Sequence, residues 1–273
     1  MDAKELIRAG RLSEAREQLT SEVRAAPSDM AKRTVLFQVL AFLGEWDKAE
    51  RHLDAMAAQS PGAETGVQVY RNLIGAERAR AEVMELKRRP SFLPSAPTYA
   101  EAHFAGYAKL LGQKHDEALV LFEQVESQRP DVAGTLNGRE FDGMYDIDAL
   151  LSGFLEAVVH ERYVWLPLEG IEEVSIPMPK SLLDVLWAPA RVTTWEGLTM
   201  SCYLPVLYPG SSGHPDERVK LGRMTEWVDL GRGFTRGIGQ HIFQAGDDEV
   251  ALLEIREILF RKPEAGEAQE SRA

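Results

Sequence analysis

The chain of 273 residues contains a single cysteine, Cys202, so it can form neither an internal disulfide nor a cysteine-based zinc site. It has no apolar run of about 18 residues, which a membrane-spanning helix needs. Its first residues, Met-Asp-Ala-Lys-Glu, lack the apolar core of a signal sequence. The net charge of −12 and the pI of about 5.1 argue against nucleic-acid and membrane-surface binding, because both depend on positive charge. We therefore expect a cytoplasmic protein without nucleic-acid or membrane partners.

The usual catalytic and cofactor-binding motifs are also missing. No lysine follows a glycine, which excludes a P-loop, and the sequence holds no Gly-x-Ser-x-Gly. The glycines 231, 233, 237 and 239 do not fit Gly-x-Gly-x-x-Gly and predict turns and bulges. No His-x-x-x-His or Glu-x-x-His pairing supports a metal site among the six histidines, which are His52, His103, His115, His160, His214 and His241. We assign no catalytic residue, cofactor or metal.

Three polar clusters have a structural and a functional interpretation. Asp142, Asp146 and Asp148 could bind a cation, but they precede a predicted helix, and capping explains them better. The run 247–249 follows a glycine and predicts a hairpin turn. His214 and Asp216 lie in a segment with the composition of an exposed loop, where an acid/base pair is the less favoured interpretation. The aromatic set is typical of a small β-domain core: Trp165, Trp187, Trp195, Tyr203, Tyr208 and Trp227.

A period of 34 residues runs through the first part of the chain. It relates Gly10 to Gly44, and the same spacing joins Leu12 to Trp46, Ala15 to Ala49, Leu19 to Leu53 and Pro27 to Pro61. Glycine permits a positive φ in the turn, alanine allows close helix approach, and proline ends the second helix. A helix-turn-helix unit of this length is the signature of tetratricopeptide repeats. We therefore predict stacked helical hairpins, with helices at 30–43 and 47–59 as the second unit.

The remaining helices follow from apolar periodicity and helix caps. We predict helices at 2–9, at 14–26 with Ser13 as its cap, at 62–89, and in a looser third hairpin at 98–111 and 114–128. Lys87, Arg88 and Arg89 suit the dipole at the end of the long helix. The proline-rich segment 91–97 predicts a bend.

After Pro130 the pattern changes. Residues 134–143 are rich in glycine and predict a boundary loop, and 148–159 predicts one more amphipathic helix. Short β-branched and aromatic runs then predict strands at 163–166, 171–176, 190–195, 198–204 and near Ile242. A short helical turn capped by Ser181 is expected at 181–187, and 249–260 fits either a strand or a short helix.

The predicted architecture is a multi-domain α+β protein. All-α, tetratricopeptide-like helical repeats are followed by a smaller, β-rich and barrel-like C-terminal domain. The predicted parts are a repeat domain at 1–133, a connecting loop and helix at 134–161, the β-rich domain at 162–262 and a disordered tail at 263–273.

Five stretches of the C-terminal half carry a family resemblance. They are Tyr163-Val-Trp-Leu-Pro167, Asp184-Val-Leu-Trp187, Leu204-Pro-Val-Leu-Tyr-Pro-Gly-Ser211, Leu221-Gly-Arg-Met-Thr-Glu-Trp227 and Gly237-Ile-Gly-Gln240. In this order they resemble the ImpE/SciE family, called TagJ in type VI secretion systems. The turn Glu45-Trp-Asp-Lys-Ala49 is similar too, so the resemblance covers nearly the whole chain. Structural roles are expected for Trp165, Pro167, Asp184, Trp187, Pro205, Tyr208, Gly222, Arg223, Trp227 and Gly239.

The resemblance implies a non-enzymatic accessory protein of type VI secretion. In this family the expected ligand is the N-terminal helix of the small sheath subunit TssB, and the expected role is to link the sheath to its recycling ATPase ClpV. From the phase of the repeats, the first helices of the hairpins would line a peptide groove, with the intervening helix beside it. The candidate groove residues are Thr34, Gln38, Phe42, Tyr70, Arg71, Tyr99 and Lys109.

Several alternatives stay open at this point. The ligand could sit on the β domain or at the junction, where Arg223 and Trp227 would be either contacts or structural residues, with Arg223 buried inside the β domain. The protein could instead be a general helical-repeat scaffold or chaperone unrelated to secretion. A hydrolase that uses His214 and Asp216 is the third and least favoured class.

Overall fold

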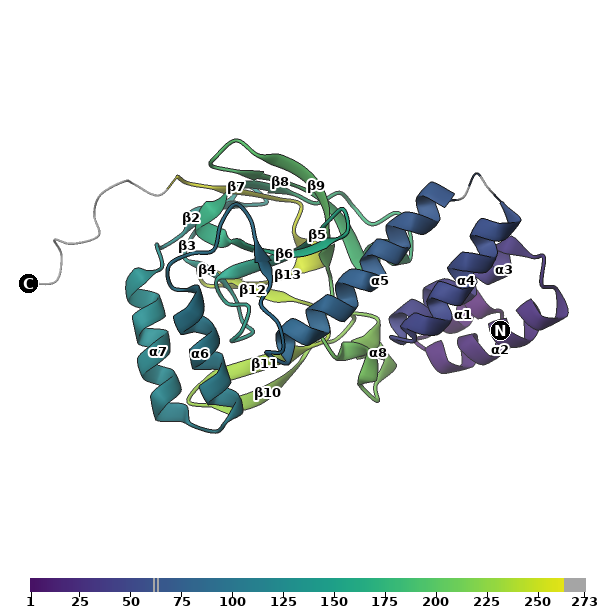
Figure 1. Cartoon of the computed structure of the whole chain (residues 1–273), viewed down its shortest axis with the longest axis horizontal. Helices are drawn as coiled ribbons and strands as arrows, with labels where there is room; N and C mark the ends of the chain where they lie inside the picture. The colour runs from purple at the N-terminus through teal and green to yellow at the C-terminus, as the bar shows by residue number, and fades with distance from the viewer. Residues whose placement is uncertain (61, 63, 263–273) are drawn as a thin grey trace, which may run out of the picture.

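The computed structural model describes residues 1–60, 62 and 64–262, with helices in the first half of the chain and mainly strands in the second (Figure 1). Two helical hairpins come first, and a long helix leads from them to the strands. A third hairpin follows. The helices are α1 (Ala3–Arg8), α2 (Leu12–Ala25), α3 (Met30–Phe42), α4 (Trp46–Gln59), α5 (Glu64–Met84), α6 (Ala100–Leu111) and α7 (His115–Gln128), with the short α8 (Glu217–Lys220) among the strands. The predicted tail at 263–273 lies outside the described residues.

The first two hairpins use their matching positions in the same way. Gly10 and Gly44 adopt positive φ angles of 75° and 66° in the turns. Ala15, Ala49 and Leu53 are fully buried at the packed face of the helices. This equivalence supports the 34-residue repeat, while its assignment to the tetratricopeptide class stays a prediction.

Caps and chain breaks explain where helices begin and end. Asp2 and Glu5 form a capping box at α1, and the Asp29 side chain accepts from Lys32 N at α3. The predicted Ser13 cap is wrong, because Ser13 lies inside α2, and both its backbone N–H and its hydroxyl donate to Glu217. The long helix ends at Met84 rather than at 89, since Leu86 takes a positive φ of 57°.

The three cations after α5 therefore lie beyond the helix rather than in its last turn. They form exposed ion pairs, Lys87 with Glu85, Arg88 with Glu82 and Arg89 with Glu101. The guanidinium of Arg89 also lies 4.3 Å from the ring centroid of Phe104.

Within the described residues, the strands form a nine-stranded sheet and two small sheets. The large sheet runs β1-β6-β5-β9-β8-β7-β14-β2-β3, so β1 and β3 are its two edges, and the predicted barrel-like closure is not confirmed. The small sheets pair β10 with β11 and β13-β12-β4. The strands are β1 (Ser91–Phe92), β2 (Ala133–Leu136), β3 (Arg139–Asp142), β4 (Met144–Asp146), β5 (Phe154–Val159), β6 (Arg162–Pro167), β7 (Ile171–Ser175), β8 (Trp187–Thr194), β9 (Thr199–Pro205), β10 (Glu226–Gly231), β11 (Phe234–Ile238), β12 (Ile242–Ala245), β13 (Asp248–Ala251) and β14 (Glu257–Phe260).

Segment 134–159 is the largest departure from the sequence prediction. The expected boundary loop is the hairpin β2–β3, and the expected amphipathic helix is a turn followed by β5. Five of the six residues of β5 are buried, so the strand is apolar on both faces and lacks an alternating pattern. The predicted bend at 91–97 likewise contains β1, which pairs in parallel with β6.

Several other predictions are confirmed. The four predicted strands between 163 and 204 match β6 to β9 within a few residues, and a 3₁₀ turn (Leu183–Val185) follows Ser181. The run 247–249 lies at the turn of the hairpin β12–β13: Gly246 and Asp247 form the turn, and β13 begins at Asp248, which pairs with Ala245. Segment 249–260 is mainly strand, through β13 and β14.

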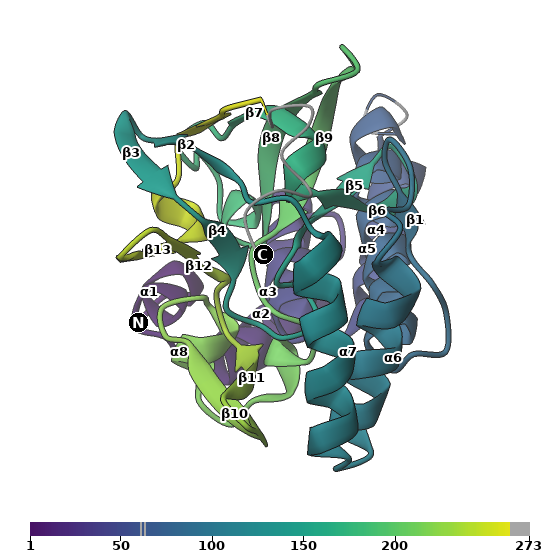
Figure 2. The ribbon, with the colours of Figure 1, turned by 90° about the vertical axis from the view of Figure 1, so that its left-hand side faces the viewer.

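The third hairpin packs on the strands. Figure 2 shows α6 and α7 side by side against the β region. Aromatic contacts join them to the sheet: His103 lies 5.2 Å from Phe154 and Phe104 lies 5.4 Å from Trp165, between ring centroids. These helices therefore cover the sheet rather than extend the array of α1 to α4.

Candidate functional site

Two of the seven candidate groove residues lie in the core. Phe42 and Tyr99 are 0% and 1% exposed, and the Tyr99 hydroxyl donates to Glu169 Oε1 at 2.7 Å. Neither side chain can contact a ligand on the surface of the folded protein. The prediction that they line a groove is therefore wrong. The phase of a helix predicts which way a side chain points, but it does not predict which other element packs against that side.

The other five candidates fall into two separate groups. Thr34 and Gln38 on α3 and Tyr70 and Arg71 on α5 are half-buried. Lys109 lies on α6 and pairs with Glu117 on α7, at the far side of the strands from α3 (Figure 1). The structure does not bring the whole set into one groove.

Within the first group, Tyr70 is held against the β region. Its ring lies 5.3 Å from Phe37 and 6.4 Å from Trp187, between centroids. Arg71 forms an ion pair with Asp54 at 2.5 Å, and the Thr34 hydroxyl donates to Met30 O inside its own helix. All four side chains of this group stay partly exposed, so a partner could still reach them.

Among the family-motif positions, Trp165, Trp187 and Tyr208 are almost fully buried. Pro205 faces Trp187 across β8 and β9, and Pro167 faces Phe154 across β5 and β6. The Asp184 carboxylate accepts from Lys180 N and Ser181 N, at 2.7 and 3.1 Å. Gly239 has a φ of 112°, and a Cβ there would lie 2.2 Å from Met224 O. Trp227 is 38% exposed, with its ring edge against Tyr208.

Segment 211–223 connects the β region to the turns of the first two hairpins. Arg223 donates to the last carbonyls of α1, to Arg8 O at 2.8 Å and to Ile7 O at 3.2 Å. A Cβ at Gly44 would lie 2.5 Å from Ser212 Oγ, so the turn and the segment touch without room for a side chain. Arg223 is exposed and bonds the helical region, which corrects the interpretation of a buried arginine inside the β domain.

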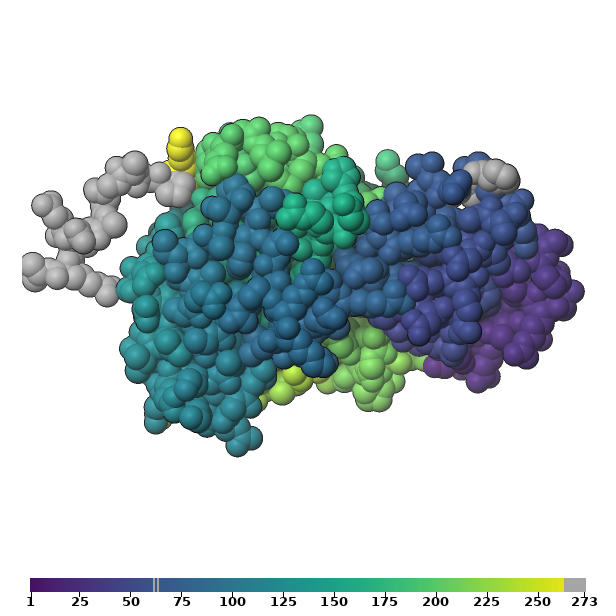
Figure 3. All heavy atoms as spheres, viewed as in Figure 1, coloured from purple at the N-terminus to yellow at the C-terminus, as the bar shows by residue number. Residues whose placement is uncertain are grey.

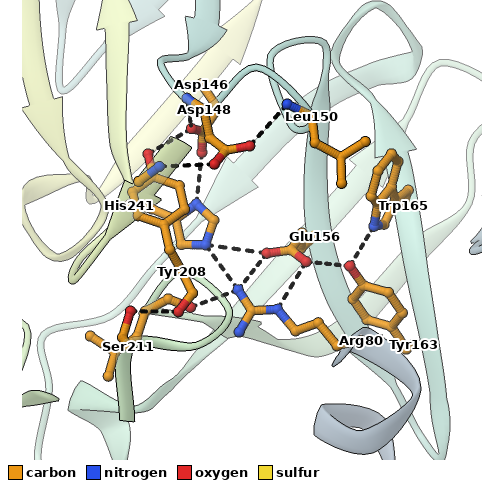
Figure 4. A network of polar contacts seen from close by, with 12 residues as sticks. Arg80, Asp146, Asp148, Leu150, Glu156, Tyr163, Trp165, Tyr208, Ser211 and His241 are labelled. Carbon is orange, nitrogen blue, oxygen red and sulfur yellow. Dashed lines mark hydrogen bonds and ion pairs between the residues drawn. The ribbon is translucent and has the colours of Figure 1, made fainter. Parts of the chain in front are cut away.

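A buried ion pair forms the joint between α5 and the strands (Figure 4). Arg80 of α5 donates to both carboxylate oxygens of Glu156 on β5, at 2.9 and 2.6 Å, and to Leu207 O at 2.6 Å. Both side chains are about 3% exposed. The Tyr163 hydroxyl also donates to Glu156, and the indole of Trp165 donates to that hydroxyl at 2.5 Å.

A second set of polar side chains continues this network. His241 Nδ1 lies 2.7 Å from Asp146 Oδ2, and its Nε2 lies 3.2 Å from Glu156 Oε2. The Tyr208 hydroxyl donates to the other oxygen of Asp146 at 2.6 Å. Asp148 accepts from Leu150 N and Gly237 N. The predicted helix cap at Asp146 and Asp148 is therefore wrong: no helix begins there, and the carboxylates organise buried turns.

The electrostatics follow from this geometry. Burial alone would lower the pKa of His241, but Asp146 and then Glu156 outweigh it and raise that pKa to about 9. Burial would raise the pKa of Glu156, but Arg80 and then His241 hold it well below its ordinary value. Burial and the neighbouring Asp146 raise the pKa of Asp148 to about 7. The network is thus a pair of cations neutralised by carboxylates inside the protein.

This charge pattern predicts a pH dependence of stability. Because the pKa of His241 is raised from 6.5 to about 9, its contribution is complete below pH 6.5 and is lost as the pH rises through 9. We expect the free energy of unfolding to fall by about 3 kcal/mol across this window. Denaturant unfolding at a series of pH values measures it. His241→Gln should flatten the slope and His160→Asn, in an exposed turn, should keep it; equal slopes in all three proteins would contradict the assignment.

The described residues assemble no catalytic centre from the motifs considered. Asp216 caps α8 and pairs with Arg218, which lowers its pKa to about 2, while His214 Nε2 lies 3.2 Å from Glu226 instead. The side chains of His214 and Asp216 therefore do not form the acid/base pair that was the less favoured interpretation of this loop. The Cys202 thiol is buried, which raises its pKa to about 12. Over the same part of the chain, no three His, Cys, Asp or Glu side chains are placed to hold a metal ion.

The buried pair of Arg80 and Glu156 was not predicted from the sequence, although the sequence contains a pattern that indicates it. Arg80 falls on the same helical face as Leu73, Ala76 and Val83, so it is a lone cation in an apolar stripe. Glu156 is likewise a lone carboxylate in an apolar strand. A charged residue at each of two buried positions indicates that the two meet, since an unpaired buried charge is costly.

The fold and its contacts define the class of the protein: an α+β protein whose helical part is joined to a β region by a buried polar network at α5 and by exposed hydrogen bonds at the first hairpin. No helix in the described part of the chain has both the length and the apolar character to cross a bilayer. The model of the family "ImpE protein" matches residues 138–259. A Pseudomonas aeruginosa protein, "Type VI secretion system accessory component TagJ", is 34% identical over 266 residues, 97% of this chain and 93% of the relative.

The chain therefore belongs to the ImpE/TagJ family. A crystal structure of a Vibrio parahaemolyticus protein has the same fold, with a TM-score of 0.85 over 95% of this chain and 97% of the other. Its sequence identity of 21% makes it a comparison of fold alone.

Proposed function

We propose that this protein is a non-enzymatic, cytoplasmic adaptor of a type VI secretion system. It binds the N-terminal helix of the sheath subunit TssB and links the sheath to the ATPase ClpV. The observation that carries the proposal is the identity of 34% with a type VI secretion accessory component over nearly the whole length of both chains. The identity of the two partners, TssB and ClpV, is the more specific part of the proposal.

The helical region supports a role in binding a helix. Helical hairpins stacked side by side offer surfaces on which one amphipathic helix can lie. Tyr70 on α5 contacts Trp187 of β8, and the half-buried Gln38 and Arg71 lie on α3 and α5. Figure 3 shows the surface of α5 flanked by segments of the β region. We propose that this surface, rather than the full predicted groove, receives the helix.

Calorimetric titration with a synthetic peptide of the cognate TssB N-terminal helix tests the proposal. We expect saturable binding that weakens about tenfold in Arg71→Ala or Gln38→Ala. Phe42→Ala is unsuitable, because its side chain is fully buried and its loss would disturb the fold. Arg88→Ala, at an exposed cation beyond α5, is the matched control and should bind normally.

The possible results distinguish an error in the proposed partner from an error in the proposed binding site. Binding that is unchanged in both variants would keep the function and move the site toward the β region. No binding at high micromolar peptide would overturn TssB as the partner and favour a general scaffold. Capture of ClpV by the protein only when TssB is present would support the linking role.

A further inference from the structure

A hollow of about 470 Å³ opens between α2, α3 and α4. Its rim is basic although the whole chain carries a net charge of −12. Arg16, Arg24, Arg33, Lys48, Arg51 and His52 line it. The local charge of this hollow is therefore opposite to that of the protein.

Part of this positive charge has no counter-ion among the described residues. Glu45 pairs with Arg16 at 2.6 Å and also with Lys48. Across residues 1–60, 62 and 64–262, no carboxylate lies within 4.0 Å of the guanidinium groups of Arg24, Arg33 and Arg51. These three guanidinium groups are therefore not neutralised by the part of the chain that the structure describes.

Arg33 is held in place without a carboxylate. Its Nη2 donates to Pro27 O at 2.6 Å, and its Nη1 lies 3.3 Å from His52 Nδ1. Its Nε is buried and has no hydrogen-bond partner within the described ranges of the chain. Burial, and then Arg33 and Arg51, lower the pKa of His52. A neutral imidazole can accept from Arg33, so the ring positions the cation rather than adding to the charge.

The floor of the hollow is apolar. Val23, Leu36 and Leu40 line it, with exposed fractions of 7%, 2% and 2%. Carboxylates would meet guanidinium groups at the rim, and an apolar side chain would cover the floor. A polyanion such as nucleic acid has no apolar side chain for this floor, and the acidic remainder of the protein would repel it.

We propose that this hollow binds an acidic, amphipathic peptide segment of a partner protein. Carboxylates of the segment pair with Arg24, Arg33 and Arg51, and an apolar residue between them packs on the floor. With 100° between successive helical residues, Leu36 and Leu40 each lie about 160° around α3 from Gln38. The hollow is thus a second surface, and this inference does not depend on where the TssB helix binds.

Fluorescence anisotropy with a labelled helical peptide of leucines flanked by glutamates tests the assignment. The test variant is Arg24→Glu with Arg51→Glu, two exposed positions whose replacement leaves the core intact. Lys87→Glu with Arg88→Glu changes the net charge equally at exposed positions outside the hollow. We expect affinity to fall at least about tenfold in the first double variant, to stay within about twofold in the second, and to weaken with salt.

Other results would overturn the proposal. Equal weakening in both double variants would mean that net charge alone attracts the peptide. The same affinity for a peptide with glutamine in place of glutamate would remove the role of the cations. Tighter binding of a single-stranded oligonucleotide at equal charge would assign the hollow to another class of ligand, and no binding by the unaltered protein would exclude the site.

Discussion

Replacing Arg80 with alanine is expected to lower the free energy of unfolding by about 3–5 kcal/mol. The change removes the cation that satisfies both oxygens of Glu156 and leaves that carboxylate buried at 3% exposure. A buried ion pair that loses one partner is strongly destabilised because the remaining charge keeps its desolvation penalty. Urea unfolding monitored by circular dichroism measures the loss.

The matched control lies two residues away on the same helix. Arg78 pairs with Glu50 and Asp47 at the surface, where its side chain is 42% exposed, so Arg78→Ala should cost no more than about 1 kcal/mol. A combined Arg80→Met and Glu156→Leu protein should recover part of the loss, since no lone charge remains. If Arg80→Ala were no worse than Arg78→Ala, the joint would contribute little to stability.

The second large effect is expected at Trp187. Its side chain is 1% exposed and lies against Trp46 and Tyr70, at ring distances of 6.2 and 6.4 Å. Trp187→Ala removes the residue through which β8 contacts α4 and α5, and we expect a loss of about 3–5 kcal/mol. Thermal unfolding followed by calorimetry measures the effect.

Two further variants separate packing from hydrogen bonding at this position. The indole N–H donates to Glu77 Oε1 at 2.9 Å, so Trp187→Phe keeps most of the packing and should cost about 1–2 kcal/mol. Trp227, another tryptophan of the family motifs, is 38% exposed, and Trp227→Ala should cost less than about 1 kcal/mol. Similar losses for both tryptophan-to-alanine variants would show that Trp187 has no special role in joining the two regions.

The sequence predicts the elements whose pattern is local. Gly10 and Gly44 indicate hairpin turns because a positive φ depends on the residue type at the turn itself and not on distant contacts. The strands after Tyr163 are predictable for the same reason, since short β-branched runs are cut by glycine and proline. The helix predicted at 148–159 is wrong because the apolar residues of this segment also fit a helical spacing. Pairing with β6 and β9 is what makes β5 a strand.

The functional surfaces are less predictable because they are formed by residues that lie far apart in the sequence. The helical phase of Tyr99 predicts an accessible side chain, yet its hydroxyl donates to Glu169, 70 residues later in the chain. The buried network joins Arg80, Glu156 and His241, and no spacing along the chain relates these three. The basic hollow combines side chains of three helices whose packing the sequence does not give.

The docking of segment 211–223 onto the first hairpins also constrains how the protein folds during synthesis. Ser13 bonds Glu217 across 204 residues, and Arg8 meets Arg223 across 215. At about 5–20 residues per second, roughly 10–40 s separate the synthesis of the first hairpin from that of its binding segment. During that interval the Gly10 and Gly44 turns remain uncovered, so the part of the protein that is made first is among the last to reach its native contacts.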